Sequence, residues 1–175
     1  MPYTALKENI MDQIWEEQAK LGFDEKEIRL YYPLSSLCHI LEKSCTVSEM
    51  EEILQGFSEN AGDGLGHLRY TLSEDRFCFH IPAEGVKWVY EHTPENAFIR
   101  QLVGLIVRPG CKMDDIETLF RANGETIVQP MNSEEFDTLM YFKNGPDKYY
   151  YCFQDDGFDI RYHRFLPGDY RDFGY

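Results

Sequence analysis

The alternation of apolar and polar residues near the C-terminal end restricts the fold more than any other feature of this sequence. Residues 137–143, 148–154 and 158–163 each alternate with a period of two, which is the pattern of a strand with one buried face. Residues 144–147 and 155–157 separate these segments and are rich in the turn-forming residues Asn, Asp and Gly. We therefore predict that the chain ends in a three-stranded antiparallel meander.

The same alternation predicts how the three strands pair. We expect Lys143 to pair with Lys148 and Asp155 with Phe158, because this alignment collects apolar and aromatic side chains on one face of the sheet. A shift by one residue would mix the two faces. The opposite face would carry two rows of side chains: Tyr141, Tyr150 and His163, then Leu139, Cys152 and Arg161.

The N-terminal and middle parts of the chain are predicted to be mainly helical. Apolar residues recur at helical spacing in six segments: residues 6–21, 34–41, 46–57, 82–92, 93–106 and 113–120. Thr46 followed by Glu49 has the pattern of a capping box, which predicts that a helix begins there. Helices of this number combined with an antiparallel meander indicate the α+β class.

A β-hairpin is inserted among these helices. Residues 67–72 and 77–81 alternate, and a four-residue turn sequence joins them. In the register that gives one apolar face, Tyr70 faces Phe79 and Arg69 faces His80. Residues 27–32 and 125–131 are also predicted to be extended, and Pro130 favours an edge position. We predict a single domain over residues 1–175, and the sequence leaves open whether hairpin and meander share a sheet.

Charge restricts the partners of this protein. The chain has 31 Asp and Glu against 17 Lys and Arg, a formal net charge of −14. This balance argues against binding to nucleic acids or anionic membrane surfaces. The acidity either serves solubility alone or favours a basic protein partner. No apolar run approaches the ~20 residues of a membrane span, and no signal core precedes Trp15, so we expect a cytoplasmic protein.

Neither metal nor cofactor chemistry is indicated. Five cysteines are scattered without a Cys-x-x-Cys motif: Cys38, Cys45, Cys78, Cys111 and Cys152. Their odd number and wide spacing favour reduced thiols over a disulfide framework or a zinc site. The five histidines fall in separate predicted elements, and the glycine-rich residues 62–66 lack the Lys and Ser/Thr of a phosphate-binding loop. We expect no metal and no cofactor.

The main candidate binding site lies on the polar face of the meander. It consists of Tyr141, Tyr150, Arg161 and His163. Tyrosine and arginine are enriched at protein interfaces because they combine large contact area with hydrogen-bonding groups, and histidine changes charge near neutral pH. The alternative is that a helix covers this face and the tyrosines serve packing only.

A secondary candidate is the cross-strand pair Arg69 and His80. The arginine would favour the neutral imidazole, which could act as a general base. The alternative is an ordinary polar pair on a sheet surface, since the sequence places no nucleophile or carboxylate beside it. Residues 161–173 are rich in aromatic and charged residues, and they either pack back on the domain or dock on another chain.

Several segments resemble a small uncharacterised family of acidic proteins from Firmicutes. They are residues 9–10, 16–22 and 29–34 near the start, and 150–153 and 162–165 near the end. The resemblance covers nearly the whole chain and implies a bacterial cytosolic protein. It transfers no catalytic or binding residue, because it implies a family without an established activity.

These observations lead to two hypotheses of function. The first is a non-enzymatic, cytosolic protein-interaction module, for example an acidic inhibitor or immunity-type protein that binds a basic partner. The second is a small hydrolase or transferase that uses His80 or His163 as a general base. Self-association through the aromatic C-terminal segment is a further alternative to a foreign partner.

Overall fold

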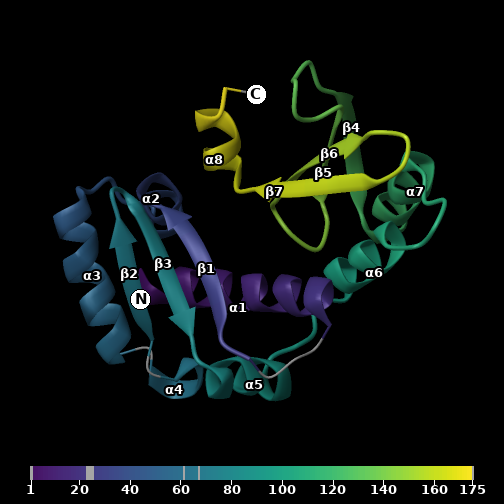
Figure 1. The fold of residues 1–175 in the computed structure, drawn as a ribbon. Coiled ribbons are helices and arrows are strands. Elements are labelled where there is room, and N and C mark those ends of the chain that lie inside the picture. The colour runs from purple at the N-terminus through teal and green to yellow at the C-terminus, as the bar shows by residue number, and fades with distance from the viewer. Residues whose placement is uncertain (1, 23–25, 61, 67, 175) are drawn as a thin grey trace. The chain divides into compact units, whose positions relative to one another are not determined.

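The computed structural model describes residues 2–22, 26–60, 62–66 and 68–174. The chain divides into two compact units, Met1–Asn96 (unit 1) and Ala97–Tyr175 (unit 2). Each unit combines helices with an antiparallel sheet, which confirms the predicted α+β class (Figure 1). Among the described residues, no helix combines the length and apolar character needed to cross a bilayer.

Unit 1 contains a three-stranded sheet in the order β1-β3-β2. Its elements are α1 (Pro2–Leu21), β1 (Ile28–Pro33), α2 (Leu34–Leu41), α3 (Val47–Asn60), α4 (Gly62–Leu65), β2 (Arg69–Ser73), β3 (Arg76–Ile81) and α5 (Ala83–His92). The predicted hairpin register is confirmed, with Tyr70 opposite Phe79 and Arg69 opposite His80. β1 pairs with the other edge of β3 and places Arg29 opposite His80 as well.

One face of this sheet forms the core of unit 1. Leu30 on β1 and Phe77 and Phe79 on β3 are buried on that face. They belong to the same cluster as Ile10 and Ile14, because α1 is amphipathic and runs behind the three strands in the view of Figure 1. Since side chains alternate along a strand, burial of this face turns the intervening residues of each strand to the other face.

The ends of the helices in unit 1 follow local sequence signals. Pro33 precedes α2, where its missing N–H costs no helical hydrogen bond. The predicted capping box is confirmed: the Thr46 backbone N–H donates to Glu49 Oε2 at 2.7 Å, and the Glu49 N–H donates to Thr46 Oγ1 at 3.4 Å. The Thr46 hydroxyl also donates to Glu49 Oε2, at 2.9 Å, and the two hydrogen bonds to this carboxylate, led by that from the Thr46 backbone, lower the pKa of Glu49. α3 therefore begins where the sequence indicates.

Unit 2 contains a four-stranded sheet in the order β4-β5-β6-β7. Its elements are α6 (Ala97–Ile106), α7 (Met113–Asn123), β4 (Glu125–Pro130), β5 (Thr138–Asn144), β6 (Tyr150–Asp155), β7 (Ile160–Phe165) and α8 (Pro167–Asp172). The predicted meander is present. β4, which contains Pro130, pairs with β5 and is an edge strand, as the proline indicated. The hairpin and the meander belong to separate sheets, which answers the question that the sequence left open.

The register within the meander is correct for one pair of strands and wrong for the other. β5 and β6 pair as predicted, with Tyr141 opposite Tyr150. Between β6 and β7 the pairing is shifted by two residues, so that Asp155 lies opposite Ile160 rather than Phe158. The Asp156 carboxylate accepts hydrogen bonds from the Phe158 and Asp159 backbone N–H groups, which lengthens the loop. A shift by two preserves both faces.

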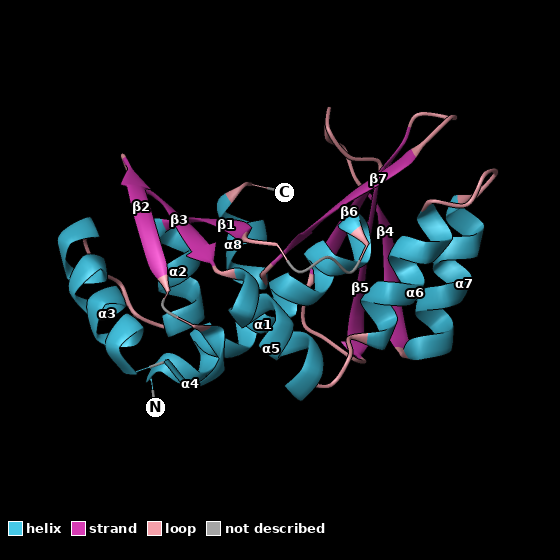
Figure 2. Cartoon of the chain, turned by 60° about the horizontal axis from the view of Figure 1, so that its bottom comes forward, coloured by secondary structure: helices cyan, strands magenta, loops and turns pink. Residues whose placement is uncertain are grey.

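Aromatic rings fill the core of unit 2. Phe120 on α7 is fully buried, and its ring centroid lies 4.9 Å from Phe98 on α6, 5.0 Å from Phe142 on β5 and 5.1 Å from Tyr151 on β6. The pairs with Phe98 and Tyr151 are edge-to-face and the pair with Phe142 is stacked, and such aromatic pairs add to the free energy gained by burial. α6 and α7 lie side by side against the strands because each contributes one of these rings (Figure 2).

We predict that Phe120→Ala lowers the free energy of unfolding by about 3–5 kcal/mol, because it removes a large side chain from a packed core. Chemical denaturation followed by circular dichroism measures this loss, and Thr118→Ala on the exposed face of α7 is the control. The single domain over residues 1–175 remains a prediction, and the same variant tests it.

Both tryptophans, Trp15 and Trp88, lie in unit 1, whereas Phe120 lies in unit 2. If the chain unfolds as a single domain, Phe120→Ala shifts the tryptophan fluorescence midpoint as far as the circular dichroism midpoint. An unchanged fluorescence midpoint would show that the two units unfold independently.

Candidate binding surface

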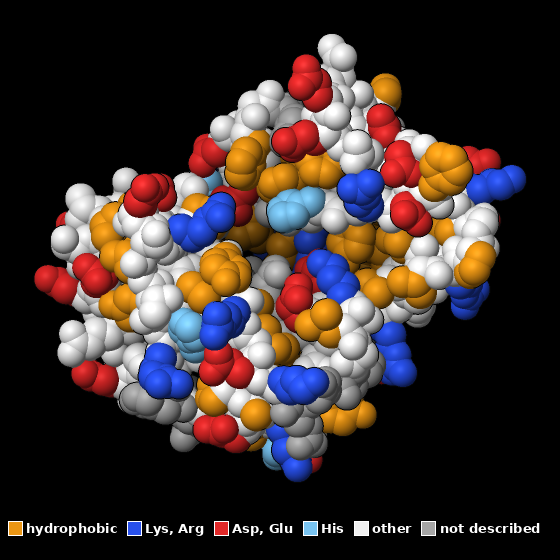
Figure 3. All heavy atoms as spheres, viewed as in Figure 1, with side chains coloured by type: hydrophobic (Ala, Val, Ile, Leu, Met, Phe, Trp, Pro, Cys, Tyr) orange, Lys and Arg blue, Asp and Glu red, His pale blue; other side chains and the backbone are white. Residues whose placement is uncertain are grey.

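The open face of the three-stranded sheet carries a concentration of positive charge. The residues on this face of the three strands are Arg29, Tyr31, Pro33, Arg69, Thr71, Ser73, Arg76, Cys78 and His80. We call Arg29, Tyr31, Arg69, Arg76 and His80 the arginine face. Figure 3 shows Lys or Arg side chains and a histidine gathered over this sheet. The face is distinctive because the whole chain has a net charge of −14.

His80 lies at the centre of the arginine face. β3 is the middle strand, so Arg29 on β1 and Arg69 on β2 occupy the register positions on either side of His80. The guanidinium groups are accessible, since Arg29 and Arg69 are exposed and 60% of the Arg29 side chain is accessible. Tyr31 is also 60% exposed. Arg76 is exposed as well, so the face offers three charged side chains and a phenol to an approaching partner.

Hydrogen bonds hold the imidazole of His80 in a fixed orientation. Its Nδ1 lies 3.4 Å from Glu27 Oε1, and its Nε2 lies 3.2 Å from Thr71 Oγ1. The Arg29 Nε also donates to Glu27 Oε1, at 3.3 Å. The hydrogen bonds from His80 and then Arg29 lower the pKa of Glu27, and the bond to Glu27 raises the pKa of Arg29. A carboxylate, an imidazole and a hydroxyl therefore form one chain.

The structure places the secondary candidate pair, Arg69 and His80, as the sequence predicts. The sequence analysis missed Glu27, Arg29 and Thr71 as neighbours of His80. Arg29 and Glu27 were missed because their proximity depends on β1 pairing with β3, across 53 residues of sequence in the case of Glu27. Thr71 was detectable, since in the predicted hairpin it lies diagonally across from His80, within reach of a long side chain.

The main candidate residues share one face of the unit 2 sheet but differ in exposure. Tyr141 and Tyr150 are half-buried, with ring centroids 4.5 Å apart. Arg161 and His163 are exposed. Because of the shifted register, His163 lies opposite Cys152 rather than Tyr150, and Arg161 lies opposite Gln154. The predicted row of Tyr141, Tyr150 and His163 is therefore wrong, although all four residues keep their predicted face.

The C-terminal segment packs on this same face. Tyr170 on α8 contacts Tyr150 edge-on at 4.8 Å and lies 6.5 Å from the ring of Phe165. Leu139, Cys152 and Phe165 form a small buried cluster beneath these rings. Of the two alternatives for the C-terminal segment, packing back on the protein is the one observed for residues up to 173, since the Phe173 ring lies 5.2 Å from that of Phe165. The tyrosines therefore contribute to a second core of unit 2.

The comparisons with known proteins give a family. A family model described as "Domain of unknown function, E. rectale Gene description (DUF3877)" matches residues 3–174. The chain belongs to this family. The resemblance to an uncharacterised family is thereby confirmed, and the family name refers to a Firmicute. Neither a curated protein nor a solved structure matches the chain. Membership of DUF3877 assigns no activity, so the function has to be inferred from the residues.

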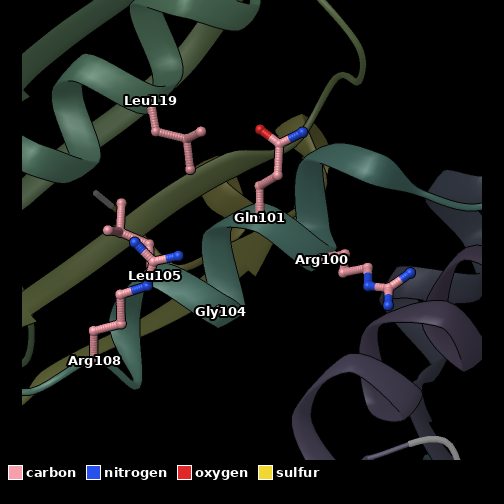
Figure 4. A pocket seen from close by; sticks show the side chains of 6 residues that line it. All are labelled: Arg100, Gln101, Gly104, Leu105, Arg108 and Leu119. Atoms are coloured by element: carbon pink, nitrogen blue, oxygen red, sulfur yellow. The ribbon is translucent and has the colours of Figure 1, made fainter.

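The described part of this DUF3877 chain contains no cluster of three or more His, Cys, Asp or Glu side chains that could hold a metal ion. A groove of about 370 Å³ lies along α6 of unit 2. Figure 4 shows Arg100 and Arg108 at its two ends, with Gly104 between them and Leu119 approaching from α7. Neither His80 nor His163 lines this groove.

Gly104 occupies an interior position of α6, and no packing contact in the described structure requires a glycine there. A Cβ atom added there would meet nothing within 4 Å. Glycine in a helix interior destabilises the helix relative to alanine. We predict that Gly104→Ala raises the free energy of unfolding by about 0.5–1 kcal/mol.

Gly85 in α5 is the matched control, because a Cβ atom there would collide with the Leu65 carbonyl group. Gly85→Ala should therefore lower the unfolding midpoint in the same denaturation experiment. A destabilising effect of Gly104→Ala would contradict the open environment of this glycine.

Proposed function

We propose that this DUF3877 protein is a non-enzymatic protein-interaction module that binds an acidic segment of a partner protein across the arginine face. The observation that supports this proposal is the collection of three arginines and a histidine on one open sheet face of a strongly acidic chain. Arginine is suited to this role because its planar guanidinium group binds a carboxylate through two parallel hydrogen bonds.

The overall negative charge is compatible with an acidic ligand. At physiological ionic strength the screening length is about 8 Å, so acidic groups elsewhere on the surface act weakly at the arginine face. Local contacts then determine the binding. Exposed Tyr31 adds an aromatic contact next to the charges, and tyrosine and arginine are the residues that most often dominate the binding energy of an interface.

A second candidate is an acidic inhibitor or immunity-type protein that binds a basic partner. The sequence of α3 favours it, since this helix carries four glutamates and no lysine or arginine. Glu52 and Glu59 are exposed on that helix. The opposite charge of α3 and the arginine face makes the two candidates separable by charge reversal.

We predict that Arg69→Glu/Arg76→Glu weakens partner binding at least about tenfold, the change that corresponds to 1.4 kcal/mol. The measurement is capture from native lysate on the immobilised protein at low and moderate salt, followed by titration of the recovered partner. Both arginines are exposed, so the fold should be retained, and circular dichroism checks this. Arg69→Lys keeps the charge but loses the paired hydrogen bonds, and it should bind with intermediate affinity.

The matched control is Glu52→Lys/Glu59→Lys on α3. If Arg69→Glu/Arg76→Glu still binds the partner and this variant does not, the second candidate, an acidic protein that binds a basic partner, is supported instead. A third variant replaces Tyr150 and Arg161 by Ala. If this variant loses binding and both charge-reversal variants still bind, the site lies on the unit 2 sheet. Binding that no variant alters would overturn the proposal.

The alternative function is a small hydrolase or transferase with a histidine as general base, either His80 or His163. The hydrogen-bonded chain of Glu27, His80 and Thr71 favours His80, because a carboxylate that orients an imidazole and a hydroxyl beside it are the elements of nucleophilic catalysis. Assays with activated esters and phosphoesters test this alternative. Activity that His80→Ala abolishes and Thr71→Ser retains would support it, and inactivity of the intact protein would count against it.

A further inference from the structure

Two cysteines that belong to no recognised sequence motif lie close together at the end of α2. The Sγ atoms of Cys38 and Cys45 lie 3.6 Å apart, and the Cys38 thiol also lies 3.8 Å from the Cys45 carbonyl oxygen. Both residues are half-buried. The remaining cysteines belong to other parts of the chain: Cys78 to β3, Cys111 to the segment before α7 and Cys152 to β6.

The end of α2 explains why the two cysteines meet. Glu42 adopts a left-handed conformation with φ of 51°, which ends the helix. The Lys43 N–H then donates to the Cys38 carbonyl oxygen at 3.0 Å, as expected of a reversal at a helix C-terminus. The chain turns back here, and Cys45 is brought beside Cys38.

A cavity gives small molecules access to one of the two thiols. Cys38 lines a cavity of about 640 Å³ together with Ser35, His39 and Lys43. Asp75, from the turn between β2 and β3, also lines it. Cys45 is half-buried like Cys38 but does not line this cavity. A small reactive solute entering the cavity would therefore meet Cys38 first.

We propose that Cys38 and Cys45 form a redox-active dithiol that hydrogen peroxide or a small organic hydroperoxide oxidises to a disulfide. Cys38 is the attacking thiol and Cys45 the resolving thiol. This assignment agrees with the environment of Cys45, since burial and the contact with Cys38 raise the pKa of Cys45 to about 11 and keep it protonated.

The chemistry balances in two steps. The Cys38 sulfur, after losing its proton, attacks one peroxide oxygen; the S–O bond forms, the O–O bond breaks, and the other oxygen takes up a proton and leaves as water, or as the corresponding alcohol when the oxidant is an organic hydroperoxide. The product is a sulfenic acid on Cys38. The Cys45 sulfur then attacks the Cys38 sulfur, the S–S bond forms, the S–O bond breaks, and water leaves with the Cys45 proton. Two thiols are oxidised and one peroxide is reduced.

The required movement is small and falls in an exposed segment. A disulfide bond is about 2.05 Å long, so the sulfurs have to approach each other from 3.6 Å. Glu42, Lys43 and Ser44 between the cysteines are exposed, so the connecting segment can adjust without disturbing the core of unit 1. The oxidised form would fix the connection between α2 and α3.

The test is oxidation of the folded, full-length protein with a small excess of hydrogen peroxide. We expect the loss of two of the five free thiols, a mass decrease of two hydrogen atoms, and a peptide map in which Cys38 is linked to Cys45. Dithiothreitol should restore both thiols. A disulfide between other cysteines, or five thiols that stay free until the protein unfolds, would overturn the proposal.

Variants separate the two roles. Cys45→Ser should increase labelling of Cys38 by dimedone severalfold, because the sulfenic acid then lacks its resolving thiol. Cys38→Ser should abolish both the labelling and the disulfide. Cys111→Ser is the matched control for a half-buried thiol elsewhere and should change neither result. Equal dimedone labelling in the parent protein and Cys45→Ser would contradict the assigned order.

Discussion

Burial of one face of each sheet is the constraint on which the rest of this structure depends. In unit 1, Phe77, Phe79 and Ile81 of β3 are fully buried. Because side chains alternate along a strand, Arg76 and His80 must then occupy the open face. β1 and β2 both pair with β3 under the same constraint, and this brings Arg29 and Arg69 to the two sides of His80. The arginine face is thus a consequence of the core beneath it.

Unit 2 obeys the same constraint but uses both faces of its sheet. The rings of Phe98, Phe120 and Tyr151 pack on one face, and a smaller cluster around Cys152 is covered on the other. Its tyrosines therefore contribute to packing, whereas the charged residues of the unit 1 sheet stay accessible. We place the binding surface on unit 1 because one face of its sheet is uncovered, whereas side chains pack on both faces of the unit 2 sheet.

The proposed dithiol lies beside the core of unit 1, against which both cysteines pack, but the geometry of the chain at the end of α2 brings the two thiols together. A left-handed residue at the end of α2 reverses the chain within a few residues, and the reversal brings together two cysteines that no spacing rule relates. Reduced, scattered thiols are the natural expectation from such a sequence. The structure places the sulfurs of one such pair 3.6 Å apart, and a bond between them would link the end of α2 to the beginning of α3.

The sequence by itself determined the period of each strand, the face to which each side chain points, the capping box at Thr46 and the pairing of Arg69 with His80. These features depend on neighbouring residues or on a short hairpin, so local pattern is sufficient. Only the tertiary structure decided that β1 lies beside His80, that α8 covers Tyr150, and that an aspartate-bonded loop shifts β7 by two residues. Periodicity states which side of a strand is buried, but it does not state which distant segment packs beside it or how many residues a loop contains.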